Sequence, residues 1–91
     1  MFTLLRPQVS RHRDGWVVRI VSRHFVELEE RDGTIVRSEV ELGSVAVVYA
    51  GTLERRSGGG PALPVSSELC APTAERIAAG LRAMGGPAEV A

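Results

Sequence analysis

The side chains that most often carry covalent or metal chemistry are few in this 91-residue chain: two histidines and one cysteine. His12, His24 and Cys70 form no CxxC, HxH or HExxH pattern, whereas a metal site needs several ligands at usable spacing. Cys70 lies just before an expected helix, whose N-terminus would favour a thiolate, and His24 could approach it as a base. Since no other part of a nucleophile signature is present, we interpret Cys70 as a partly buried structural thiol. We expect no enzyme, no metal and no cofactor.

Paired carboxylates and a glycine-rich stretch are the other features that could support catalysis. Glu27 with Glu29, and Glu39 with Glu41, alternate along expected strands, so each pair faces one way. General acid–base catalysis would need a cleft that shifts their pKa values, and the sequence indicates none. Residues 56–60 (RSGGG) lack the lysine of a phosphate-binding loop, and no helix directly follows them. A solvated sheet face and a flexible loop are the simpler interpretations.

A concentration of arginine near the N-terminus raises nucleic-acid binding as an alternative function. Residues 1–24 hold five arginines and one aspartate, whereas residues 25–54 hold seven acidic residues and two arginines. The candidate side chains, which interleave cations with a stacking ring, are Arg11, Arg13, Arg19, Arg23 and Trp16. The net charge of the whole chain is zero, so no long-range field attracts phosphate. A small regulatory or nucleic-acid-associated domain therefore stays the alternative rather than the main prediction.

The elements that position these side chains are predicted to be short strands followed by one helix. Residues 15–31, 34–41 and 44–50 are rich in β-branched and aromatic side chains and are bounded by glycine-containing turns. Because short connections cannot form parallel crossovers, we expect an antiparallel meander of about four to five strands. With one C-terminal helix, this predicts an α+β fold in a single domain over residues 1–91.

The turn at residues 31–33 allows the register of two strands to be predicted. A three-residue loop with Gly33 in the left-handed region places apolar side chains opposite one another, whereas a two-residue loop would place them opposite charges. The expected pairs are Leu28–Val36 and Val26–Ser38 on one face, and Glu27–Arg37 and Arg23–Glu41 on the other. The expected core side chains here are Val26, Leu28, Val36, Val40 and Leu42. Phe25 and Ile35 fall on the charged face.

The C-terminal part of the chain is predicted to be a loop, a helix and a last strand. Three glycines and two prolines make residues 55–64 a flexible loop. We expect a short turn at residues 66–70 and then a helix over residues 72–84, with Pro72 in its first turn. The expected buried stripe of this helix is Ala74, Ile77, Leu81 and Met84. Residues 85–87 (GGP) end the helix, and residues 88–90 form a possible short edge strand.

The single cysteine and the short apolar runs bear on where the protein is found. No intramolecular disulfide is possible, and small secreted domains usually depend on disulfides. No apolar run approaches the ~20 residues that span a bilayer. We therefore expect a soluble cytoplasmic protein without membrane contact, and we leave its oligomeric state open.

From residue 26 onward the order of short sequence features resembles a known family. The matching segments are residues 36–39 (VRSE), 47–54 (VVYAGTLE), 66–68 (SSE), 75–77 (ERI) and 88–90 (AEV). Over about residues 26–90 they resemble small bacterial immunity proteins of polymorphic toxin systems, in particular the immunity protein 74 family. The first 24 residues have no counterpart in this pattern.

The resemblance implies a protein that binds and neutralises a cognate toxin. Toxin-binding residues vary among immunity proteins, so none is transferred to this chain. Charge instead predicts that an acidic group covers a basic surface of the partner, with two apolar side chains on the same face as anchors. These candidates are Glu27, Glu29, Glu39, Glu41, Phe25 and Ile35.

Overall fold

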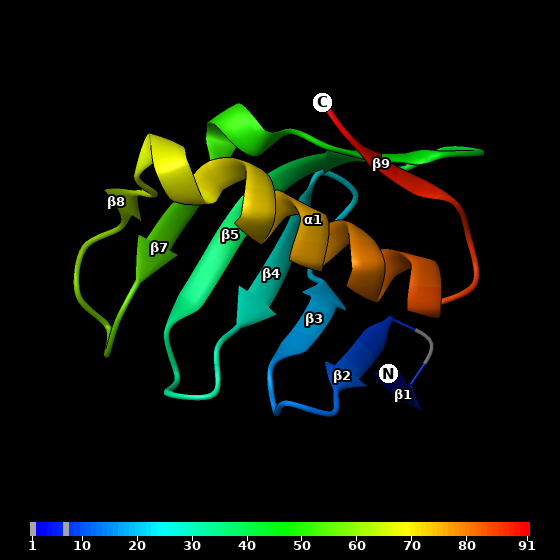
Figure 1. The fold of residues 1–91 in the computed structure, drawn as a ribbon, viewed down its shortest axis with the longest axis horizontal. Coiled ribbons are helices and arrows are strands. Elements are labelled where there is room, and N and C mark those ends of the chain that lie inside the picture. The colour runs from blue at the N-terminus through cyan, green and yellow to red at the C-terminus, as the bar shows by residue number, and fades with distance from the viewer. Residues whose placement is uncertain (1, 7) are drawn as a thin grey trace.

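The fold is one α-helix packed across one face of a curled, mostly antiparallel sheet (Figure 1). The computed structural model describes residues 2–6 and 8–91, with side chains from Gln8 onward. The predicted α+β class is confirmed, but the described residues form nine strands rather than about four to five. Within them, no helix is both long and apolar enough to cross a lipid bilayer.

The strands follow one another mostly as neighbours. Their bounds are β1 Phe2–Arg6, β2 Val9–His12, β3 Val17–Ile20, β4 Phe25–Glu29, β5 Ile35–Glu41, β6 Ala46–Val48, β7 Glu54–Arg56, β8 Leu63–Pro64 and β9 Ala88–Val90. The helices are α1 Ser67–Ala83 and a short 3-10 helix, Ala50–Thr52. The sheet order is β1-β2-β3-β4-β5-β6-β9, and β7 pairs with β5 and β8. Strand β9 was expected at an edge, and it is there, but it pairs parallel to β6 because α1 returns the chain across the sheet.

The apolar run of residues 15–31 forms two strands rather than one. A turn at residues 21–24 separates β3 from β4, and the backbone N–H of Val21 donates to the carbonyl of Phe25 at 3.1 Å. The N–H of His24 donates to Ser22 Oγ at 3.3 Å, which satisfies a turn donor with a side chain. A polar Ser-Arg-His segment thus turns the chain without a glycine.

The register of β4 and β5 agrees with the prediction. Leu28 is paired with Val36, Val26 with Ser38 and Glu27 with Arg37. Residues 31–33 form the connecting loop, with Gly33 at a φ of 93°. The N–H of Thr34 donates to Asp32 Oδ1 at 2.9 Å, and this bond lowers the pKa of the Asp32 carboxyl. The backbone N–H of Val40 donates to the carbonyl of His24, which extends the predicted register to the neighbours of Arg23 and Glu41. Within the described part of the chain, however, Arg23 and Glu41 form no ion pair.

The helix is longer than the sequence prediction, and Pro72 lies inside it rather than in its first turn. Residues 67–71 are helical, so the predicted turn at residues 66–70 is wrong and Cys70 belongs to the first turn of α1. A proline so near the helix start removes only one backbone hydrogen bond. Glu68 in the first turn compensates in part, because a negative side chain is favourable at that end of the helix dipole.

The predicted loop of residues 55–64 is shorter than expected. Its two ends form β7 and β8, which pair with each other, while β7 also extends the edge of β5. Only residues 57–62 connect the two strands. Pro64 is tolerated because β8 is an edge strand, where a missing N–H breaks no ladder bond.

The core lies between α1 and the covered face of the sheet. Its buried members are Val18, Val26, Leu28, Val36, Val40, Val48, Leu53, Ala74, Ile77, Ala78, Leu81 and Ala88. The predicted helix stripe is confirmed, with Met84 packed at the margin. Leu42 was expected in the core but is 42 % exposed, because β5 ends at Glu41 and the chain then turns away. Gly85, with a φ of 113°, follows the end of the helix as predicted.

Helix and sheet approach each other closely at Gly80. A Cβ atom added there would lie 2.5 Å from the Cβ and Cγ2 atoms of Val18, which is too close for two carbon atoms. The hydroxyl of Ser10, on β2, donates to the Gly80 carbonyl at 3.0 Å. Ser10 and Val18 are both fully buried. Glycine therefore lets α1 lie directly on β2 and β3.

Candidate binding face of the sheet

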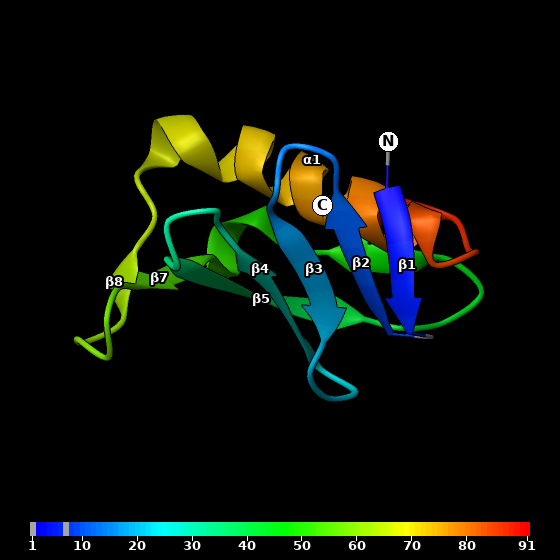
Figure 2. The same ribbon diagram turned by 90° about the horizontal axis from the view of Figure 1, so that it is seen from below.

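The two faces of the sheet differ in what covers them. Figure 2 shows α1 along one side of the strands, while no element of the described chain covers the other side. We call this uncovered side the open face. On β3, β4 and β5 it consists of Val17, Arg19, Phe25, Glu27, Glu29, Ile35, Arg37, Glu39 and Glu41. All six residues of the predicted partner-binding set are among them, since side chains alternate along a strand.

Four residues at the centre of the open face form a chain of ion pairs, which we call the charged ladder. Glu27 Oε2 accepts from Arg37 Nη2 at 3.0 Å, and Glu27 Oε1 lies 3.5 Å from Arg19 Nε. Arg19 Nη2 then donates to Glu29 Oε1 at 2.8 Å. Such partly exposed pairs contribute about 0–1 kcal/mol each to stability. Their main effect here is to neutralise Glu27 and Glu29, so these two glutamates offer little charge to a partner.

The two apolar candidates of the open face are half-buried rather than freely exposed. The guanidinium carbon of Arg37 lies 5.2 Å from the centre of the Phe25 ring, within the range of a cation–π contact. Ile35 is paired with Glu29 on one side and with Arg56 on the other. Both side chains thus lie between charged groups, as the register predicted.

A different environment surrounds the glutamates at the end of β5. Glu41 Oε2 accepts a hydrogen bond from the Tyr49 hydroxyl at 2.9 Å, and this bond raises the pKa of Tyr49. Glu39 is exposed and its carboxylate makes no ion pair within the described residues. Glu89, on β9, is paired with Val47, which is itself paired with Glu41. We call Glu39, Glu41, Tyr49 and Glu89 the acidic corner.

A groove opens beside the acidic corner. It has a volume of about 650 Å³ and is lined by Arg23, His24, Glu39, Val40, Glu41, Leu42 and Tyr49. Its lining comes from the β3–β4 turn, from the end of β5 with Leu42, and from Tyr49, which directly follows β6. The structure therefore places exposed carboxylates, an aromatic ring and an exposed leucine around one hollow.

Sequence reasoning missed Tyr49 and Glu89 in this corner. The spacing of Tyr49 from Val47 in an expected strand was a usable signal, since both then face the same way. No comparable signal existed for Glu89. Its position depends on the parallel pairing of β6 with β9, which join distant parts of the chain.

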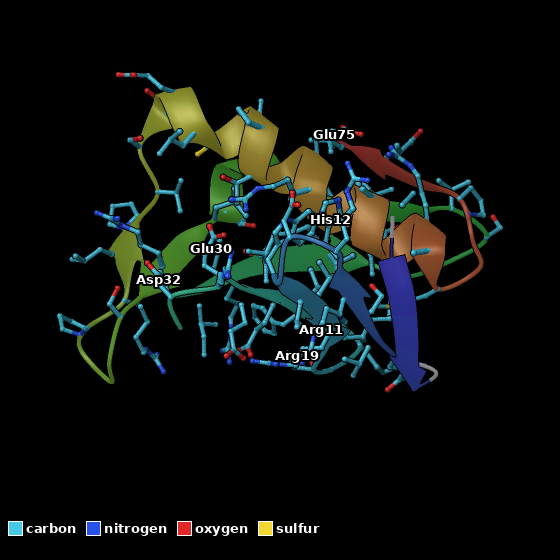
Figure 3. All side chains as sticks on the ribbon, turned by 60° about the horizontal axis from the view of Figure 1, so that its bottom comes forward. Arg11, His12, Arg19, Glu30, Asp32 and Glu75 are labelled. Atoms are coloured by element: carbon cyan, nitrogen blue, oxygen red, sulfur yellow. The ribbon has the colours of Figure 1, made fainter. Side chains whose placement is uncertain are left out.

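The five residues of the nucleic-acid alternative do not gather on one surface. Figure 3 shows Arg11 and Arg19 on the side of the strands away from α1. Arg13 lies in the β2–β3 turn and Arg23 in the β3–β4 turn, which are at opposite ends of β3. Trp16 packs against the core on the helix side. These five residues therefore do not form the arrangement that the sequence suggested, in which cations alternate with a stacking ring.

Trp16 instead belongs to an assembly that ties the sheet to α1. Its ring stacks on His12 with a centroid separation of 4.4 Å, and the guanidinium carbon of Arg76 lies 5.5 Å from it. Arg76 donates to both carboxylate oxygens of Glu30, at 2.7 and 2.8 Å, which raises the pKa of Arg76. Two parallel bonds of this kind fix orientation as well as distance. The assembly thus has a structural role that accounts for Trp16.

The remaining candidates for chemistry occupy separate places. Cys70 is half-buried in α1, and its Sγ donates to the Val65 carbonyl at 3.5 Å. His24 lines the groove of the acidic corner. Among the side chains from Gln8 to the C-terminus, no three His, Cys, Asp or Glu residues are grouped so as to hold a metal ion.

Comparison with known proteins gives no relative: the chain matches no family model, no curated protein and no solved structure.

Proposed function

We propose that this chain is a protein-binding module of the immunity type, which neutralises a cognate bacterial toxin by covering it with the open face. The observation that carries the proposal is that α1 covers one face of the sheet and leaves the other face uncovered. One face is occupied by α1, while the other presents side chains whose positions are already fixed by strand pairing and by the charged ladder. Preorganised side chains lose little conformational entropy on binding.

The charge of the open face favours a basic partner. The acidic corner holds three glutamates, whereas the arginines of the charged ladder are engaged by Glu27 and Glu29. Complementary charge mainly speeds association and suppresses wrong partners, while half-buried apolar groups such as Phe25 supply desolvated contact area. A toxin that acts on nucleic acid needs a basic surface, and covering that surface would inhibit it.

The proposal is tested by co-expression with the product of the neighbouring gene, which the proposal expects to be the toxin. Wild-type chain should restore growth of cells that produce the toxin and should form a complex with it in isothermal titration calorimetry. The double variant Glu39→Arg/Glu41→Arg should lose binding at least about tenfold, because two favourable charges become repulsive. The matched control is Glu75→Arg on the exposed side of α1, which should bind as wild type does.

Two results would contradict the proposal in different ways. Absence of binding and of rescue by the wild-type chain would remove the immunity function. Loss of binding in the Glu75 variant with normal binding in the double variant would place the interface on the helix side.

A further inference from the structure

We infer that the acidic corner and its groove are the docking site for arginine side chains on the partner's surface, an inference that rests on the proposed function. It narrows the binding surface from the whole open face to the end formed by β5, β6 and β9. It also assigns the chemistry of the group that is bound.

The carboxylates of the open face are unevenly paired with cations. Glu27 and Glu29 already accept from Arg19 and Arg37. Within the described chain, the carboxylates of Glu39 and Glu41 form no ion pair, and Glu41 accepts only the neutral Tyr49 hydroxyl. A cation on a partner can therefore pair directly with the carboxylates of the acidic corner. At the charged ladder it would first have to displace an arginine.

The lining of the groove suits a guanidinium group. The Tyr49 hydroxyl binds Oε2 of Glu41, so the carboxylate is oriented while its Oε1 stays available as an acceptor. A guanidinium group has five N–H donors in a plane, which can bond to two carboxylates and stack on an aromatic ring together. An ammonium group is a compact point charge and matches this arrangement less well. Glu39, Glu41 and Tyr49 all line the groove.

One arginine of the chain itself, Arg23, lines the groove. Arg23 and Glu41 both line the groove, but the two side chains form no ion pair within the described residues. Arg23 is exposed, in the turn that follows β3. It therefore weakens the negative field of the groove without occupying it. Removing its charge should strengthen the binding of a second cation.

The inference is tested by nuclear magnetic resonance with ¹⁵N-labelled protein and the peptide acetyl-Gly-Arg-Gly-Arg-Gly-amide as the probe. Amide signals of Glu39, Glu41, Tyr49 and Glu89 should shift with the peptide concentration, whereas those of the charged ladder should not. A peptide with lysine in place of arginine should bind more weakly. A peptide with glutamate in place of arginine should not bind.

Charge-neutral variants separate the acidic corner from general attraction. The variant Glu39→Gln/Glu41→Gln should bind the arginine peptide roughly 2- to 30-fold more weakly, as expected for two exposed ion pairs. Glu54→Gln, an exposed position on β7, is the matched control and should leave binding unchanged. Arg23→Gln should tighten binding. Equal binding by the double variant and the wild type, shifts that centre elsewhere, equal binding of the lysine peptide, or no binding at all would overturn the inference.

The same variants distinguish this inference from the proposed function. If the toxin binds the wild type and Glu39→Gln/Glu41→Gln equally well, the immunity function stands and the acidic corner is not its arginine site. If the toxin does not bind the wild type, the proposed function itself fails.

Discussion

Replacing Gly80 with alanine is the most direct test of how α1 lies on the sheet. The added Cβ would lie 2.5 Å from two atoms of Val18 and 2.9 Å from a third. Val18 is fully buried and cannot swing aside, and the bond from Ser10 to the Gly80 carbonyl holds the helix in place. The helix or the strand must therefore shift to admit one methyl group.

Two opposing effects set the size of the loss. Overpacking a well-filled core costs about 1–3 kcal/mol, and the upper end applies because the obstacle is a branched side chain next to the backbone. Alanine recovers about 1 kcal/mol through its better helix propensity. We expect the free energy of unfolding to fall by about 2 kcal/mol. For a domain of this size that lowers the melting temperature by roughly 8–16 °C.

Urea unfolding followed by circular dichroism measures this change. Ala83→Gly, at an exposed position of the same helix, isolates the propensity effect and should cost at most about 1 kcal/mol. Val18→Ala combined with Gly80→Ala should cost less than the two single changes added, by about 0.5 kcal/mol or more, because shared space couples them. A Gly80→Ala protein as stable as wild type, or more stable, would refute the close approach of helix and sheet.

Two further predictions follow from hydrogen bonds at the two ends of the sheet. Tyr49, the chain's one tyrosine, should lose its proton above its usual pKa of 10.0 in an ultraviolet absorbance titration, and Glu41→Gln should return the pKa toward that value. Because the folded state raises this pKa, the bond stabilises the fold below about pH 10 and is lost as the pH rises through the folded value. Arg76→Lys should lower the free energy of unfolding by about 1 kcal/mol, because a lysine cannot form two parallel bonds with Glu30 and the pair is partly solvent-screened. Calorimetric melting should show the Arg76→Lys effect shrinking at high salt, and an unchanged melting temperature would contradict it.

The hairpin of β4 and β5 could be predicted because its information is local. Alternating apolar and charged residues lie on both sides of an Asp-Gly turn, and only one register matches them. The buried stripe of α1 could be predicted for the same reason. The start of α1 could not, because a proline in isolation signals a first turn, whereas here the helix begins five residues before Pro72, in a segment that is mostly exposed and so has no apolar pattern to announce it.

Features that depend on distant parts of the chain could not be predicted from the sequence. The parallel pairing of β6 with β9 depends on where α1 returns the chain, and no local sequence pattern predicts it. Leu42 looked like the next inward residue of a strand, but the strand ends one residue earlier. The covered and open faces could be told apart from alternation alone. Which glutamates are neutralised on the open face depends on β3, whose pairing with β4 was not predicted.

In the candidate site, too, the local features could be predicted from the sequence and the longer-range features could not. The sequence placed all four glutamates of the prediction on one face, and that placement agrees with the structure. Their separation into the charged ladder and the acidic corner follows from the positions of Arg19 and Tyr49, which come from different hairpins. Electrostatic roles in a sheet are thus set across strands, while sequence patterns describe one strand at a time.

The central claim, that the open face is the working surface, is tested most directly by hydrogen exchange of the chain alone and in complex with the proposed toxin partner. We predict slower exchange on binding at residues 39–41, 47–49 and 88–90, with exchange in α1 unchanged. Slower exchange confined to α1 and the β2–β3 turn, with none at the end of β5, would contradict the account.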